Sequence, residues 1–193
     1  MRIGGLGTGV KLILVRHSKP EVQTGLCYGR LDIPACPLAV AHDAQRLAQT
    51  LPHGWPVRVS ALARAQQLAN ALHTLRPDMP LFTDPRLNEM DFGDWEGRLW
   101  RDIPQTHIDQ WTAHFMHHPV GGGESVADVL NRLAQAWQHT RATHAQAVWI
   151  THAGVINALQ CLQQHQGQIP TTLYAHQWPS SGIGFGQSVD VEG

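Results

Sequence analysis

Cysteine is scarce in this sequence, and its distribution excludes several classes of protein. The 193 residues contain three cysteines, Cys27, Cys36 and Cys161, an odd number with no repeated spacing. A disulfide framework does not fit this pattern, and no Cys-x-x-Cys pair indicates a structural zinc site. We therefore expect reduced thiols, as in a cytoplasmic protein.

Charge is also scarce, and neither sign dominates. Charged residues make up 15% of the chain, with 14 basic against 15 acidic side chains, so the formal net charge is -1. Binding to nucleic acid or to an anionic membrane draws on a surplus of positive charge, so we expect neither as a partner. An anion could be bound only by a local cluster of side chains.

Long hydrophobic runs are missing as well. No apolar run approaches the roughly 18 residues of a membrane span, and the first residues do not resemble a signal peptide. We therefore predict a cytoplasmic protein. The length fits a single domain over residues 1–193, with residues 1–10 as a loose lead-in. The glycines between Gly5 and Gly9 precede the first predicted strand, which disfavours a dinucleotide-binding loop, and no cofactor is expected there.

The sequence does contain a regular alternation of strand and helix patterns. Short β-forming segments alternate with segments whose apolar residues recur every three or four positions. We predict strands at 11–15, 57–60, 80–83 and 147–151, helices at 38–51, 62–75, 125–144 and about 154–164, and closing strands at 171–174 and 182–189. Ser60 is the expected cap of the second helix. This order predicts an α/β fold, a three-layer α/β/α sandwich whose mostly parallel central sheet has helices on both faces.

Several reactive side chains follow predicted strands. Arg16 and His17 end the first strand, and His152 directly follows the strand at 147–151. Arg64 begins the helix after another strand, and Glu89 lies on the loop after a fourth. Because the carboxyl ends of parallel strands meet at one edge of a sheet, where ligands bind, we expect these side chains to form an anion site with a candidate nucleophile or base.

Five motifs occur in chain order: Arg16-His17-Ser18, Ser60-Ala-Leu-Ala-Arg-Ala65, Leu87-Asn-Glu89 through Gly97, Gly122-Gly-Glu-Ser125 and Thr151-His-Ala-Gly-Val-Ile156. Together they resemble the histidine phosphatase superfamily, in the branch that includes cofactor-dependent phosphoglycerate mutases. The resemblance covers most of the chain and implies a phosphoglycerate mutase-like fold. Within the family, the loop from Gly25 to Pro34 is similar to that of α-ribazole phosphatases of cobalamin biosynthesis.

The resemblance implies a metal-independent phosphomonoester hydrolase that works through a phosphohistidine intermediate. His17 would attack phosphorus, while Arg16 and Arg64 would clamp the phosphate with planar guanidinium donors. His152 would stabilise the charge on the equatorial oxygens, and Glu89 would protonate the leaving alkoxide and then activate water. The clustered arginines would lower the pKa of His17, and neither a metal nor another cofactor is expected.

The identity of the acid leaves alternatives open. Asp91, Asp94 and Glu96 lie close to Glu89 in the sequence, and any of the four carboxyl groups could serve. Glu89 is favoured because it matches the acidic position of the family motif.

The substrate-binding residues beyond the arginines are also open. Ser18 stands where the family usually has glycine, so its side chain either points away from the phosphate or binds it. Gln23 or Thr24 could replace the polar residue that the family has a few positions after its first histidine. Ala153, beside His152, completes the candidate set, and it occupies the position where the acid phosphatase branch carries aspartate.

Two other functions compete with hydrolysis. A mutase would use the same residues, but the stretch between Glu89 and His152 is short for the insertions that exclude water from a mutase site. A non-catalytic phosphate-binding protein on the same fold is the second option, and the complete residue set argues against it. We expect a small phosphomonoester as the substrate, with α-ribazole 5'-phosphate as a candidate. The oligomeric state is open, with a homodimer as one option.

Overall fold

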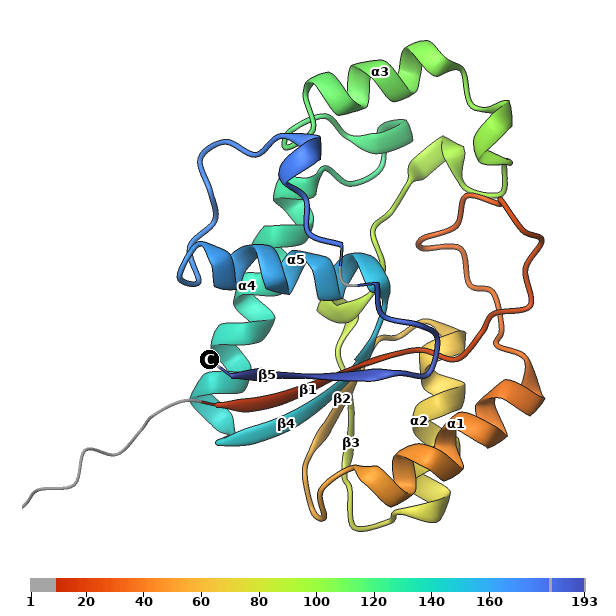
Figure 1. The fold of residues 1–193 in the computed structure, drawn as a ribbon, viewed down its shortest axis with the longest axis vertical. Helices are drawn as coiled ribbons and strands as arrows, with labels where there is room; N and C mark the ends of the chain where they lie inside the picture. Colours follow the sequence, from red (N-terminus) through yellow and green to blue (C-terminus); the bar gives the residue numbers. More distant parts are fainter. Residues whose placement is uncertain (1–9, 181, 193) are drawn as a thin grey trace, which may run out of the picture.

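The fold is a layered α/β arrangement, seen in a computed structural model that describes residues 10–180 and 182–192 (Figure 1). Across these residues, five strands form one sheet in the order β3-β2-β4-β1-β5. The strands are β1 (Lys11–Arg16), β2 (Val57–Val59), β3 (Leu81–Thr83), β4 (Gln146–Thr151) and β5 (Ser188–Glu192). The first four run parallel and β5 pairs antiparallel with β1. The predicted mostly parallel sheet is therefore confirmed.

Helices cover both faces of this sheet, as predicted. They are α1 (Pro37–Thr50), α2 (Ala63–Leu75), α3 (Gln105–Ala113), α4 (Val126–Thr143) and α5 (Ala153–Gln164). One core joins the sheet to α1 and α2, and a second joins it to α4 and α5, while α3 lies away from the sheet at the top of the view (Figure 1).

The two cores arise from the alternation of side chains along the strands. Successive residues of a strand point to opposite faces, so Leu12 and Leu14 of β1 enter the core with α4 and α5. Val15 of β1 enters the core with α1 and α2. In the central strand β4, Trp149 and Val148 divide in the same way. Strands buried on both faces read as the continuous apolar runs seen in the sequence.

The helix starts carry local signals that the sequence contains. Pro37 occupies the first turn of α1, where a missing N–H costs nothing. Helix α4 begins with a reciprocal capping box, in which the Ser125 side chain accepts from the Asp128 N–H and the Asp128 carboxylate accepts from the Ser125 N–H. These caps fix where each helix starts relative to the loops that precede it.

Three local predictions were wrong. Helix α2 starts after Leu62 without a side-chain cap, because Ser60 lies two residues before that position and its hydroxyl accepts the N–H of Leu62 itself at 3.2 Å. The segment 171–174 forms no strand, and the closing strand lies at Ser188–Glu192, because the edge of β1 admits only one partner there. Val10, assigned to the lead-in, is buried in the core with α4 and α5. The rest of the lead-in, including the Gly5–Gly9 run, lies outside the described residues.

Because β1, β2, β3 and β4 run parallel, their carboxyl ends lie at one edge of the sheet, and the candidate site lies there. Among the described residues, no helix combines the length and the apolarity that crossing a membrane requires.

Candidate active site

His17 directly follows β1 and is 2% exposed. Its ring Nδ1 lies 2.7 Å from the carbonyl oxygen of Ser18. Because a carbonyl oxygen can only accept a hydrogen bond, Nδ1 carries the proton of the neutral ring and Nε2 keeps its lone pair. Burial, reinforced by the charges of Arg64 and Arg16, lowers the pKa of His17 to about 3. The predicted direction is confirmed, and the neutral ring with one bare nitrogen is the state that a nucleophile needs.

Two guanidinium groups lie beside this ring. Arg64, at the start of α2, is fully buried. It donates to the main-chain carbonyls of Gly29 and Leu31, in the loop of residues 18–36 that follows β1, at 2.6 and 2.9 Å. Arg16 donates to the carbonyl of Ile183 at 2.8 Å, and its guanidinium carbon lies 3.9 Å above the ring of Phe185. In both arginines Nε is buried and has no partner among the described residues. These positively charged, partly unpaired groups can accept an anion.

His152 follows β4, and its ring centroid lies 4.9 Å from that of His17. Its Nε2 lies 2.7 Å from the Ser60 hydroxyl, which lies 2.9 Å from Oδ1 of Asn88. That amide oxygen also accepts the N–H of Ala61, so it cannot donate, and the Ser60 proton points to Asn88. His152 therefore donates from Nε2, and its buried Nδ1 is left without a partner among the described residues.

The environment of His152 disfavours its charged form. Burial, followed by the neighbouring His17 and Arg64, lowers the pKa of His152 well below its usual value. The ring is thus neutral without a ligand. Sequence reasoning found His152 but missed the support from Ser60 and Asn88, although both residues lie within the recognised motifs.

Glu89 places its carboxylate at the N-terminus of α5. One oxygen accepts the N–H of Gly154 at 3.1 Å, and the other accepts the N–H of Met90 at 3.1 Å. Burial lowers the pKa of Arg64, and the charge of Glu89 acts in the opposite direction. Glu89 therefore lies within electrostatic range of the guanidinium groups, while Gly154 holds it two residues beyond His152.

The other three acids are occupied in different ways. Asp91 accepts the N–H of Gly93 at 2.8 Å and closes a local turn. Glu96 accepts three main-chain N–H groups, from Arg30, Leu31 and Phe92, and so ties the 18–36 loop to its neighbour. Asp94 is exposed. Among the four candidates, Glu89 is the carboxyl group that contacts the N-terminus of α5.

Comparison with known proteins agrees with this geometry. Residues 12–175 match the histidine phosphatase superfamily, branch 1. The chain belongs to this superfamily. Its relatives include phosphatases, and the protein is a phosphatase.

The relatives of this histidine phosphatase differ in their substrates. It is 31% identical over 164 residues to the adenosylcobalamin/alpha-ribazole phosphatase of Escherichia coli K12, covering 78% of this chain and 77% of the relative. It is 29% identical over 160 residues to phosphoserine phosphatase 1 of Hydrogenobacter thermophilus, covering 79% and 75%. Among solved structures, TTHB049 from Thermus thermophilus superimposes with a TM-score of 0.70 at 26% identity, over 94% of this chain and 93% of the other.

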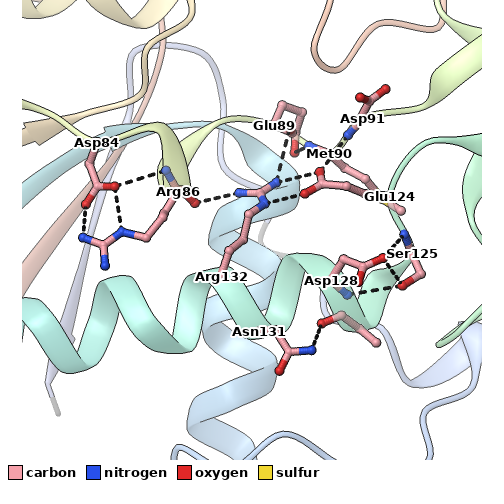
Figure 2. Close-up of polar contacts among 11 residues, drawn as sticks. Asp84, Arg86, Glu89, Met90, Asp91, Glu124, Ser125, Asp128, Asn131 and Arg132 are labelled. Carbon is pink, nitrogen blue, oxygen red and sulfur yellow. Dashed lines mark hydrogen bonds and ion pairs between the residues drawn. The ribbon is translucent and has the colours of Figure 1, made fainter.

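A mostly buried ion pair in this histidine phosphatase holds the segment that carries Glu89 (Figure 2). Arg132 of α4 pairs with Glu124 through two hydrogen bonds, at 2.8 and 3.1 Å. The same guanidinium donates to the carbonyls of Arg86 and Glu89, at 2.6 and 3.3 Å. Glu124 in turn accepts the N–H of Asp91 at 3.0 Å. Arg132 of α4 and Glu124 just before it therefore hold main-chain groups on both sides of Glu89. Sequence reasoning missed this role, although Glu124 lies in the Gly-Gly-Glu-Ser motif.

The remaining candidates occupy different surroundings. The Ser18 hydroxyl is buried and donates to Asp43 of α1 at 2.7 Å. Its hydrogen is therefore directed at α1. Gln23 is exposed and lines a hollow together with Trp100. The described lining of this hollow contains neither of the two histidines of the site nor its two arginines. Ala153 is the first residue of α5, next to Gly154. The geometry thus gives no phosphate contact to the Gln23 side chain.

Proposed function

We propose that this phosphatase hydrolyses phosphomonoesters through a covalent phosphohistidine at His17, without a metal ion, and that α-ribazole 5'-phosphate is its substrate. The observation that carries the mechanism is the hydrogen bond from His17 Nδ1 to a main-chain carbonyl. It leaves Nε2 as the nucleophile in a buried site beside two guanidinium groups.

In the first step, Nε2 of His17 attacks phosphorus and the bond from phosphorus to the ester oxygen breaks. Glu89, in its protonated form, gives its proton to that oxygen, so the alcohol leaves neutral. Arg16 and Arg64 neutralise the phosphoryl oxygens, as a metal ion does in other phosphatases. The Nδ1 proton of His17 stays hydrogen-bonded to the Ser18 carbonyl, which balances the charge that develops on the ring.

His152 takes part through the nitrogen that has no partner among the described residues. In the ligand-free site its Nδ1 carries no proton, because Nε2 donates to Ser60. A dianionic phosphate favours protonation of this nitrogen, which then donates to a phosphoryl oxygen. The Ser60–Asn88 chain keeps the ring in the orientation that this requires.

In the second step, water attacks the phosphohistidine. Glu89, now a carboxylate, accepts the proton of the attacking water as the bond between Nε2 and phosphorus breaks. Inorganic phosphate leaves and the starting protonation states return. The same carboxyl group thus serves as acid and then as base.

The α-ribazole assignment draws support from relatives that carry that name, at modest identity. A panel containing α-ribazole 5'-phosphate, O-phosphoserine and 3-phosphoglycerate would rank the substrates. A preference for O-phosphoserine would refute the α-ribazole assignment, and efficient transfer to a second phosphoglycerate with negligible phosphate release would indicate a mutase.

The mechanism is tested by labelling. Rapid quenching with a ³²P-phosphomonoester should give acid-labile, base-stable label on the wild type and none on His17→Ala. Glu89→Gln should slow turnover and retain label, because the phosphoenzyme forms from activated esters but hydrolyses slowly. Full turnover by His17→Ala would refute the assigned nucleophile.

A further inference from the structure

An apolar cavity of about 200 Å³ borders Glu89 on the side of α3 and α4. Glu89 and Gly154 are among its lining residues. Its other lining residues include four aromatic rings from three parts of the chain: Phe92, Trp111 with Phe115, and Trp178. The ring centroid of Phe115 lies 5.6 Å from that of Trp111 and 5.7 Å from that of Trp178, so these rings form a continuous wall.

The position of this cavity connects it to the leaving group. In the proposed reaction, Glu89 protonates the ester oxygen, so that oxygen must come within hydrogen-bond distance of the carboxylate. The part of the alcohol beyond the oxygen must then occupy space that the same carboxylate borders. The aromatic cavity is such a space: Glu89 belongs to its described lining, whereas His17, His152 and the two arginines do not, so Glu89 connects the cavity to those residues.

The cavity has the size and polarity for one aromatic group. A dry cavity of about 150 Å³ lined by apolar side chains holds benzene. The cavity here is somewhat larger, and Glu89 is the one charged residue among the described residues of its lining. One wall donor is also unpaired, because the buried indole N–H of Trp111 has no acceptor within the described part of the chain. The donor and the apolar rings together suit an occupant that is mostly apolar.

The same lining disfavours a carboxylated alcohol. Phosphoserine and phosphoglycerate carry a carboxylate close to the ester oxygen, and that group needs a cation to offset its desolvation. The described lining contains no lysine, arginine or histidine, and Glu89 would repel a second carboxylate. The lining of the cavity therefore favours esters whose alcohol is apolar over esters whose alcohol carries a carboxylate.

We infer that this cavity is the leaving-group subsite and selects phosphate esters of alcohols that carry an apolar aromatic group over esters whose alcohol carries a carboxylate. This inference rests on the proposed hydrolysis with Glu89 as the acid. It assigns Phe115 and Trp178, which lie far from His17 in the sequence, to substrate selection.

The test compares two alkyl esters whose leaving groups have similar basicity with one ester of a carboxylated alcohol. The wild type is assayed with 3-phenylpropyl phosphate, propyl phosphate and O-phosphoserine. Because the first two alcohols differ by a remote ring, their ratio of kcat/KM reports binding of that ring. We expect a ratio of about tenfold or more, the scale on which a pocket distinguishes apolar groups. O-Phosphoserine should be the poorest of the three.

Variants connect the ratio to the cavity. Phe115→Ala should reduce the preference for the phenylpropyl ester, and Trp178→Leu, at a half-buried position, provides the same test if Phe115→Ala fails to fold. Trp178→Arg adds a cation to the wall and should raise kcat/KM for O-phosphoserine relative to the phenylpropyl ester. Phe82→Ala, at an exposed aromatic residue on the edge strand β3, is the matched control and should keep the wild-type ratio.

The outcomes separate the two proposals. Turnover of all three esters with a phenylpropyl-to-propyl ratio near one would overturn the subsite and leave the hydrolase intact. A wild-type preference for O-phosphoserine would overturn it as well, and so would an unchanged ratio in folded Phe115→Ala and Trp178→Leu. Absence of turnover on every ester, with no label on His17, would overturn the proposed function itself.

Discussion

Gly154→Ala should separate catalysis from folding. A methyl group at this position would lie 2.4 Å from one carboxylate oxygen of Glu89 and 3.3 Å from the other. Two non-bonded heavy atoms cannot stay 2.4 Å apart, so the carboxylate of Glu89 must move. Since it is the end of a flexible side chain, the displacement is cheap, and the cost falls on the position of the acid.

The expected effects on rate and stability have different sizes and directions. General acid–base catalysis contributes about 10²–10⁴-fold, so we expect kcat for alkyl phosphates to fall by roughly 10²-fold. Gly154 lies in α5 without a positive φ, and alanine is favoured over glycine by up to about 1 kcal/mol within a helix. The free energy of unfolding should therefore stay the same or rise slightly.

A double-mutant cycle provides the assay. Steady-state kinetics on propyl phosphate would be measured for Gly154→Ala, Glu89→Gln and the double variant, with urea unfolding of each. If alanine acts through Glu89, the double variant should be no slower than Glu89→Gln alone, because residues that share one function are not additive. Additive losses, or a Gly154→Ala enzyme of wild-type rate, would refute the argument.

Three further predictions follow from other contacts. Arg132→Gln breaks a mostly buried pair with Glu124, so urea unfolding should show a loss of about 3 kcal/mol in the free energy of unfolding. Because Glu89 also loses its support, kcat should fall more than KM changes. An unaltered kcat in the folded variant would contradict this role. In the folded protein His17 stays neutral down to about pH 3, because its pKa is lowered to about 3, whereas the unfolded chain takes up this proton near pH 6.5. The free energy of unfolding should therefore fall as the pH drops between these values, by at most about 1.4 kcal/mol per pH unit for this group. His17→Gln should be less acid-sensitive between about pH 6 and 4, and an equal pH slope in the two proteins would count against the burial argument. Cys27 is fully buried and its pKa is raised to about 12, whereas Cys36 is half-buried. A thiol reagent at about pH 8 should therefore modify Cys36 first and Cys27 only on unfolding. Prompt labelling of Cys27 in the native enzyme would disprove this.

The sequence by itself determined the parts of the protein that depend on local pattern. Apolar runs ending in Arg16-His17 and in Thr151 marked two buried strands, because a strand covered on both faces needs apolar residues throughout. The direction of those strands then placed His17, His152 and Arg64 at one edge of the sheet. Local pattern misplaced the closing strand, because edge pairing depends on which distant strand is free to accept a partner.

The tertiary structure decided what depends on contacts between distant residues. It gave Glu89, unlike its three neighbouring acids, a hydrogen bond from the N–H of Gly154, and it directed Nδ1 of His17 to a main-chain carbonyl. It also placed Trp178 with Phe115 around the cavity beside Glu89. Such relations have no sequence period, because folding brings together residues whose separation along the chain carries no signal.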